Sequence, residues 1–327
     1  MSARPVAQLP PQPPQQPPPQ PQRPIALQHS TATRVPLRVV VTGGNRGFGA
    51  GMARELAARG HCVVVLARRA PNPSSVPPNS RLGFVVCDVR DYASVAGAAH
   101  TARDMMSGID VWINNAAAYP PPFYGDMGMR RAVGLPDADE WADGVRACCD
   151  TNLLGCVWGT RAAADVMRDQ VTTGHVFNVL GSGSDGSTCV GHALYGATKA
   201  AAAIYSRSAR AEADALSLPL RIHDLRPGPM DTRLYWDHVE SALGRGRRAT
   251  DDAWVGGGWP MRLRRAAFSA MCLDPDEVAA EAADRIEGVV YSTGEARQGH
   301  RALDCYTAPL LRRLLGALTG RAARRSE

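Results

Sequence analysis

Short apolar runs alternate with stretches of helical periodicity from Leu37 onward, and this alternation limits the possible folds of the chain more than any other feature. Runs such as residues 37–42 are apolar without interruption, which indicates strands buried on both faces of a sheet. Strands that alternate with helices form parallel sheets. The sequence therefore predicts one α/β domain with a doubly wound parallel sheet. Expected strands are residues 37–42, 62–67, 82–87, 109–114, 175–180 and 220–225, and expected helices are about 48–59, 94–106, 141–169, 194–216 and 275–287.

The two ends of the chain differ from this domain, which we expect to span residues 35–305. Residues 1–34 are rich in proline and glutamine and hold no acidic residue, so they cannot form a packed core. A disordered leader and an organelle transit peptide both fit, because the missing acids favour a transit peptide and the shortage of serine does not. Residues 306–327 carry leucines at helical spacing among arginines. They fit a helix packed on the domain or a helix lying on an anionic membrane.

Several classes of function are disfavoured by the composition. The net charge of +6 is spread along the chain, without basic stretches interleaved with aromatic residues, so we expect no nucleic-acid partner. The eight cysteines form no CxxC pair and the histidines lack metal-ligand spacing, so we expect no metal. No apolar run approaches the roughly 18 residues of a membrane span.

A glycine-rich turn follows the first expected strand. Glycines at 43, 47 and 49 allow a tight turn, let the backbone approach a pyrophosphate, and start a helix whose positive end faces the phosphates. With a strand before it, a helix after it and a second strand beyond, this turn indicates a Rossmann-like dinucleotide site. The expected contacts come from Thr42, Gly43, Asn45, Arg46, Gly47, Phe48 and Gly49.

The end of the second expected strand indicates which dinucleotide binds. An NAD enzyme places an acid there against the ribose hydroxyls, whereas this chain has Arg68. Arg68 and Arg46 can bind the extra phosphate of NADP, so we expect NADPH as the cofactor. Asp88, followed by Val89, ends the third strand and can accept a hydrogen bond from the adenine amino group or simply cap the strand.

Lys199 is the only lysine of the chain, and the remaining 36 of its 37 Lys and Arg residues are arginines. It lies four residues after Tyr195, so on a helix the two side chains share one face. A neighbouring ammonium lowers the pKa of a tyrosine toward neutrality, and a lysine is also a compact donor to a ribose. The pair therefore indicates an acid catalyst and its partner.

Three further polar residues are candidates for the same chemistry. Ser182 stands thirteen residues before Tyr195, just past an expected strand, where its hydroxyl could polarise a carbonyl. Ser184, in the same glycine-rich loop, competes for this role. Asn152 is expected in mid-helix, where asparagine is unfavourable, and a water-mediated proton relay to Lys199 would explain it.

Together these motifs, with residues 114–117 and 227–232, resemble the short-chain dehydrogenase/reductase pattern over about residues 37–290. The resemblance implies Tyr195 as proton donor, Lys199 as modulator of its pKa, and Ser182 as the residue that orients the carbonyl. It also implies that Asn152 takes part in a relay. Ala117 stands where the family usually has glycine, which puts the local turn in doubt. The implied cofactor contacts include Asn115, Ala116, Ala117, Pro227, Gly228, and Thr232 near the carboxamide.

Within that superfamily the chain is most similar to plant and algal chlorophyll b reductases. The similar stretches are residues 109–115, 151–155, 164–167, 174–178, 268–278 and 306–310. The resemblance implies reduction of the formyl group on ring B to a hydroxymethyl group, with a chlorophyll pigment as the small-molecule substrate. In that family the serine matches Ser184. An insertion around residues 119–139 and the presence of Ser182 depart from the family on the substrate side.

The resulting hypothesis is an NADPH-dependent reductase of formyl chlorophyll in the chloroplast, associated peripherally with the thylakoid membrane. One alternative is a reductase of another apolar aldehyde or ketone, in the chloroplast or in the cytoplasm. Another is a non-catalytic NADP-binding interaction protein, against which the intact Tyr195, Lys199 and Asn152 argue. A homo-oligomer and a hetero-oligomer are both compatible with the sequence.

Overall fold

A parallel sheet forms the centre of the domain. The computed structural model describes residues 35–71, 81–120, 138–189, 193–228, 230, 254–255, 259–260, 273–291 and 303–305. Within them a seven-stranded sheet has the order β3-β2-β1-β4-β5-β6-β9, with all neighbouring strands parallel. The strand order reverses between β1 and β4, so the carboxyl ends of these strands flank a binding crevice. The strands are β1 Arg38–Thr42, β2 Cys62–Ala67, β3 Leu82–Val86, β4 Val111–Asn114, β5 Gly174–Val179, β6 Leu220–Arg226 and β9 Leu303–Asp304.

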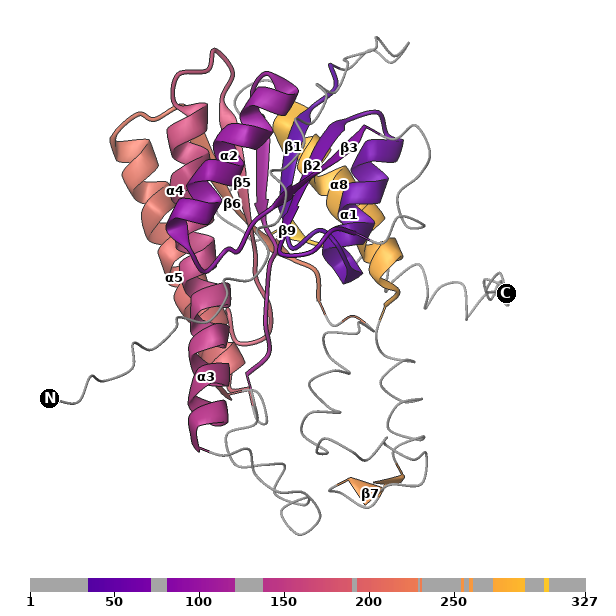
Figure 1. Cartoon of the computed structure of the whole chain (residues 1–327), viewed down its shortest axis with the longest axis vertical. Coiled ribbons are helices and arrows are strands. Elements are labelled where there is room, and N and C mark those ends of the chain that lie inside the picture. Colours follow the sequence, from indigo (N-terminus) through magenta and orange to yellow (C-terminus); the bar gives the residue numbers. More distant parts are fainter. Residues whose placement is uncertain are drawn as a thin grey trace, which may run out of the picture.

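Helices cover both faces of this sheet. One face carries α1 and α8, which pack against each other, and the other carries α2, α4 and α5 (Figure 1). The doubly wound α/β fold expected from the sequence is confirmed. The helices are α1 Gly47–Ala58, α2 Tyr92–Met106, α3 Ala138–Cys149, α4 Gly155–Met167, α5 Ala193–Ala215 and α8 Pro275–Tyr291, and a short antiparallel pair is formed by β7 Trp254–Val255 and β8 Trp259–Pro260.

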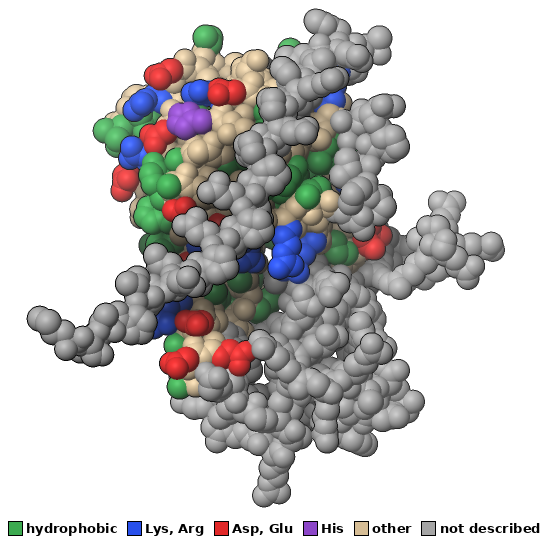
Figure 2. All heavy atoms as spheres, viewed as in Figure 1, with side chains coloured by type: hydrophobic (Ala, Val, Ile, Leu, Met, Phe, Trp, Pro, Cys, Tyr) green, Lys and Arg blue, Asp and Glu red, His purple; other side chains and the backbone are tan. Residues whose placement is uncertain are grey.

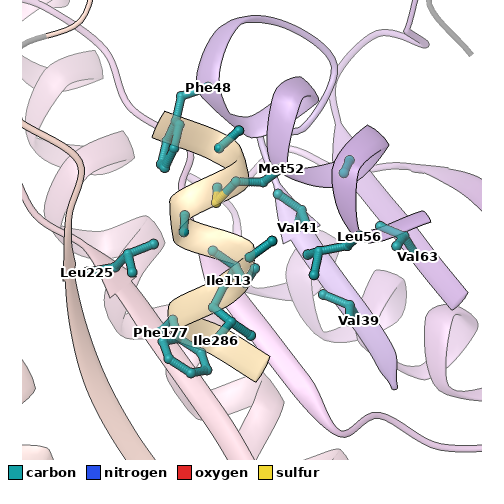
Figure 3. Packing of buried hydrophobic residues seen from close by; sticks show 14 of the residues in the cluster. Val39, Val41, Phe48, Met52, Leu56, Val63, Ile113, Phe177, Leu225 and Ile286 are labelled. Carbon is teal, nitrogen blue, oxygen red and sulfur yellow. The ribbon is translucent and has the colours of Figure 1, made fainter. Parts of the chain in front are cut away.

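The apolar core has one part on each side of the sheet. On the first side α8 lies over the strands, and its Ile286 packs with Phe177 and Leu225 (Figure 3). Met52 from α1 closes the same cluster. On the second side Trp112, which has no exposed surface, packs among residues of α2 and α4. Burial on both faces explains why the central strands are apolar throughout.

Two details of the helices depart from the expected boundaries. Helix α2 begins at Tyr92, two residues early, because the Asp91 side chain accepts hydrogen bonds from the amides of Ala93 and Ser94. The single helix expected over residues 141–169 is divided into α3, a π-helical segment η2 (Asp150–Leu154) and α4. Insertions of this kind are common at functional sites. Strand β9 was not expected, and the expected leader and tail lie outside the described residues.

In the view of Figure 2, acidic and basic side chains are mixed over the described part of this face. No helix among the described residues is long and apolar enough to cross a membrane. Those residues also contain no group of three or more histidine, cysteine or acidic side chains able to hold a metal ion.

Candidate active site

The end of β1 is tied to the end of β4, and this contact fixes the glycine turn. The Thr42 hydroxyl accepts hydrogen bonds from the amides of Asn115 (3.0 Å) and Ala116 (3.1 Å). The Asn115 side chain donates to the Thr42 carbonyl at 2.9 Å. Gly43 has a φ of +65°, and a Cβ there would lie 2.8 Å from the Ala116 Cα. Only glycine fits at this position.

The rest of the turn combines tight packing with an open edge. A Cβ on Gly49 would lie 2.3 Å from the Asn115 Nδ2, so the start of α1 is pressed against the neighbouring strand end. At Gly47, with a φ of +55°, a Cβ would meet nothing within 4 Å. Arg46 beside it is exposed, Asn45 is half-buried, and Phe48 is buried in the core. The turn is therefore open at Gly47, where α1 begins and where a dinucleotide phosphate would lie.

The residues expected around the adenosine end lie at the ends of β2 and β3. Arg68 is exposed directly after β2. The Asp88 carboxylate accepts hydrogen bonds from Arg90, at 3.0 Å from its Nε and 2.6 Å from its Nη2. This pairing holds the pKa of Asp88 below its usual value. Val89 is buried, and its Cγ2 would lie 3.0 Å from a Cβ on Gly155.

Tyr195 and Lys199 lie one turn apart in α5 and are 9% and 3% exposed. The Lys199 Nζ donates a hydrogen bond to the Val179 carbonyl at 2.9 Å and lies 5.7 Å from the centre of the Tyr195 ring. Burial lowers the pKa of Lys199 to about 8. Burial raises the pKa of Tyr195, so the lowering expected from its neighbour is not found here. The two side chains are nevertheless in one site, as their spacing indicates.

Asn152 lies in the π-helical segment and is 2% exposed. Its Oδ1 accepts from the Ala118 amide at 2.8 Å, and its Nδ2 donates to the Ala118 carbonyl at 2.9 Å. The same Nδ2 contacts the Thr198 hydroxyl at 3.1 Å. These bonds connect the loop after β4 to α5. They give this unfavourable mid-helix residue a direct structural reason, in addition to any role in a relay.

A small cavity lies between Asn152 and Lys199. It has room for about one water molecule. Two strand ends and two helical segments each contribute a polar side chain to its lining, and these groups could hold such a water. The lining consists of Thr42, Asn114, Ala116, Asn152, Gly155, Cys156, Val179, Lys199 and Ala202.

The two candidate serines occupy different environments in the turn after β5. The Ser182 side chain is exposed, whereas Ser184 is 6% exposed and its amide donates to the Gly181 carbonyl at 3.1 Å. Gly181 lies against the catalytic candidate, since a Cβ on it would lie 2.7 Å from the Tyr195 hydroxyl oxygen. The turn after β5 therefore brings the Gly181 backbone against that hydroxyl.

The expected contacts near the nicotinamide are only partly described. Ala117 is half-buried after β4, Pro227 is buried after β6, and Gly228 is exposed with a φ of +76°. The expected contact at Thr232 lies outside the described residues. Those that are described gather at the carboxyl edge of the sheet with the glycine turn, Tyr195 and Lys199.

A chain of hydrogen-bonded, buried polar side chains lies next to the carboxyl edge of the sheet. The Asn114 Nδ2 donates to the Asn178 Oδ1 at 2.8 Å, and the Asn178 Nδ2 donates to the Ser206 hydroxyl at 3.2 Å. Ser206 in turn donates to Asp224, which lies 3.3 Å from Arg210. The chain joins β4, β5, β6 and α5, and so fixes these three strands and α5 relative to one another.

Sequence reasoning missed an aromatic neighbour of the site. Tyr119 follows Ala118 in the loop after β4, and its ring stacks on Tyr195 with centroids 4.3 Å apart and planes inclined by 13°. The available signal was an aromatic residue directly after the Asn114 to Ala117 motif. Nothing in that pattern indicates which way the ring points.

Comparison with known proteins identifies relatives of this chain. Chlorophyll(ide) b reductase NOL, chloroplastic, of rice (Oryza sativa subsp. japonica) is 32% identical over 207 residues, which are 61% of this chain and 57% of that protein. Probable chlorophyll(ide) b reductase NYC1, chloroplastic, of the same plant is 34% identical over 189 residues, 50% of this chain and 34% of that protein. The chain thus spans between about a third and just over half of these relatives.

Solved structures share the fold at lower identity. An actinorhodin polyketide ketoreductase variant with NADPH has a TM-score of 0.60 and 21% identity, over 84% of this chain and 98% of that chain. A serine dehydrogenase complexed with NADP+ has a TM-score of 0.58 and 22% identity, over 81% of this chain and 93% of that chain. The family model for short chain dehydrogenase matches residues 38–242. The chain therefore belongs to the short-chain dehydrogenase family and is an oxidoreductase of that family.

Proposed function

We propose that the protein is an NADPH-dependent carbonyl reductase. The observation that carries this proposal is the burial of Tyr195 and Lys199 in one site, beside Asn152 and a water-sized cavity. The site lies at the same sheet edge as the glycine turn, so a dinucleotide bound there can reach it. A site that only bound NADP would have no need of a buried acid and ammonium.

The cofactor part of the proposal rests on the turn between β1 and α1. The open backbone at Gly47 and the start of α1 would hold the pyrophosphate. The exposed Arg46 and Arg68 would hold the 2′-phosphate, for which Arg provides paired donors. Asp88 and Val89 would border the adenine. When bound, NADPH supplies the hydride for the carbonyl carbon.

The protein would supply the proton. Burial keeps the Tyr195 phenol neutral, which is the form that can donate a proton to the carbonyl oxygen. The Lys199 ammonium would stabilise the phenolate left behind, and it would hold the nicotinamide ribose. The Tyr195 phenolate would then take a proton from the Lys199 ammonium, and a water held by Asn152 in the adjoining cavity would resupply that proton to Lys199 from the solvent.

The carbonyl oxygen needs a second hydrogen-bond donor. Ser182 is the proposed donor because its hydroxyl is exposed at the turn beside Gly181. Ser184 is the competitor, since it is buried close to the same turn. Separate Ser182→Ala and Ser184→Ala variants distinguish them: loss of the donor should reduce turnover by roughly 10² to 10³-fold, and loss of the other serine should not.

The proposed substrate is the formyl group of chlorophyll b or chlorophyllide b, reduced to a hydroxymethyl group. Support comes from the two rice relatives, which carry the name chlorophyll(ide) b reductase, at 32% and 34% identity. Their chloroplastic designation supports a chloroplast location for this protein. We also propose that residues 306–327 attach the enzyme to an anionic thylakoid surface.

The test is to incubate the purified protein with NADPH and chlorophyllide b, or chlorophyll b in detergent, and to separate the pigments. The expected product is the hydroxymethyl pigment, formed one for one with NADPH oxidation. Tyr195→Phe should reduce the rate by at least about 10² to 10⁴-fold while the affinity for NADPH survives. An unchanged pigment with turnover of another apolar aldehyde would refute the substrate, and a Tyr195→Phe variant with wild-type turnover would refute the mechanism.

A chain ending at residue 306 tests the membrane part separately. Loss of binding to anionic liposomes with an unchanged melting temperature would support it. A full-length protein that binds no liposomes would exclude it.

A further inference from the structure

We infer that Tyr119 is a positioning residue for Tyr195: it covers the catalytic ring and fixes the direction of its hydroxyl. This inference rests on the proposed role of Tyr195 as proton donor. It assigns a function to an aromatic residue that the glycine turn, the Tyr195–Lys199 pair and Asn152 do not require.

The first support is the geometry of the two rings. Their centroids lie 4.3 Å apart and their planes are inclined by only 13°, so Tyr119 lies flat on one face of Tyr195. With this cover Tyr195 is 9% exposed. A ring held in this way cannot tilt freely about its Cβ, so the stack limits where the hydroxyl oxygen can lie.

The second support is that the backbone before Tyr119 is fixed. Asn152 binds both the amide and the carbonyl of Ala118, at 2.8 and 2.9 Å. The Cys148 thiol approaches the same carbonyl at 3.5 Å. The π-helical segment and α3 therefore hold the residue that precedes Tyr119. Helices α3 and α5, from which Cys148 and Tyr195 come, are in contact. The stack is thus part of a fixed frame.

The third support is the close contact at the other end of the Tyr195 ring. The Gly181 backbone leaves no room for a side chain, since a Cβ would lie 2.7 Å from the phenol oxygen. Tyr119 limits the ring from its face, and Gly181 limits it at the hydroxyl. Between them they leave the phenol oxygen one narrow position, as delivery of a proton to a bound carbonyl requires.

The cover also contributes to the raised pKa of Tyr195. Burial is the largest cause of its raised pKa, and the next is the neighbouring Tyr119 phenol. Cys148 from α3 and Cys189 from the loop before α5 act in the same direction. Among the described residues, the Lys199 ammonium is a positive charge close to this ring, with its Nζ 5.7 Å from the ring centre. Without Tyr119, water would reach the phenol and its pKa would fall.

The experiment compares Tyr119→Ala and Tyr119→Phe with the wild type. Tyrosinate absorbance is measured for each protein and for the same protein that also carries Tyr195→Phe. The difference between the two curves is the ionisation of Tyr195 alone. Carbonyl turnover, KM and the affinity for NADPH are measured alongside. Tyr92→Ala is the matched control, because it removes a comparable aromatic pair, with Trp158 at 5.4 Å, from the exposed side of α2.

In Tyr119→Ala we expect Tyr195 to ionise at a lower pH than in the wild type. Its kcat should fall at least about tenfold, because the phenol oxygen is no longer held in place, while the Kd for NADPH is unchanged. Tyr119→Phe should restore turnover to within about threefold of wild type, since the stack needs a ring and not a hydroxyl. The Tyr92→Ala control should match the wild type in the ionisation of Tyr195 and in turnover.

Turnover in Tyr119→Ala within about threefold of wild type overturns the inference, because the phenol oxygen would then be held in place without the stack. If Tyr119→Ala does not fold, Tyr119→Leu, which fills part of the volume but cannot stack, is read by the same criterion. Because wild-type turnover is measured first, a wild type that reduces no carbonyl refutes the proposed function and is distinguished from a Tyr119→Ala variant that is as active as the wild type.

Discussion

A stacked histidine pair predicts that the protein loses stability in mild acid. His175 on β5 and His223 on β6 lie with ring centroids 5.3 Å apart and planes inclined by 9°. The His175 Nδ1 and the His223 Nε2 are 3.1 Å apart, so one ring donates a hydrogen bond to the other. Phe177 stacks on His223 at 4.7 Å. Burial is the main cause that lowers the pKa of His175 to about 4 and that of His223 to about 3.

The sign and size of the effect follow from these two pKa values. Both lie below the unfolded value of about 6.5, so the unfolded chain binds more protons as the pH falls below 6.5. A pH of 5 lies about 1.5 units below the unfolded pKa, and each unit contributes about 1.36 kcal/mol. Protonation of each histidine therefore stabilises the unfolded state by about 2 kcal/mol at pH 5. The sum is about 4 kcal/mol, a large fraction of a typical folding free energy of about 5 to 15 kcal/mol.

Urea denaturation at pH 7 and pH 5, followed by circular dichroism, measures this loss. His223→Gln keeps a hydrogen-bonding side chain but cannot titrate, so its loss between the two pH values should be smaller by about 2 kcal/mol. His100→Gln is the matched control, because His100 is exposed on α2. The reasoning is refuted if a His175→Gln/His223→Gln double variant loses as much stability between pH 7 and 5 as the wild type.

Three further predictions concern the helices and the site. Gly159→Ala should cost roughly 1 to 3 kcal/mol of unfolding free energy, because its Cβ would lie 1.9 Å from the Asn114 Oδ1. Gly97→Ala, where a Cβ on α2 would meet nothing within 4 Å, should instead stabilise by about 0.5 to 1 kcal/mol, and equal melting temperatures for the two variants would contradict this. Arg68→Asp should raise the Kd for NADPH far more than that for NADH, and a wild type without preference between them would exclude the proposed phosphate contact. Lys199→Arg should lose most turnover although it keeps the charge, because a planar guanidinium does not fit the place of an ammonium that bonds the Val179 carbonyl; a nearly active variant would contradict this.

The sheet and most helices could be predicted from the sequence because their signals are local. Continuous apolar runs such as the one in β2 indicate a buried strand, and the glycine turn at 43–49 indicates the helix that follows. The start of α8 is also marked locally, because Asp274 before Pro275 accepts a hydrogen bond from the Asp276 amide at 2.7 Å. Each of these signals is contained within a few residues, so no tertiary information is needed to read it.

The features that sequence reasoning missed depend on contacts between distant segments. The π-helical turn at Asp150–Leu154 places Asn152 against Ala118, a residue 34 positions away. No periodicity of the helix itself signals this. The stack of Tyr119 on Tyr195 and the raised pKa of that phenol follow from burial, which spacing does not show. Residue types and spacing can name the members of a site, but their environment is decided by packing.

The burial of Lys199 makes the protein a reporter of its own local opening. It holds the only ε-amino group of the chain, and it is 3% exposed on the buried side of α5. An acylating reagent directed at amines therefore meets no lysine on the surface of the native protein. Labelling of Lys199 requires an opening that separates α5 from the end of β5, so the labelling rate measures the free energy of that opening. The N-terminal amine also reacts, but only the peptide that holds Lys199 reports the opening of α5, without any engineered probe.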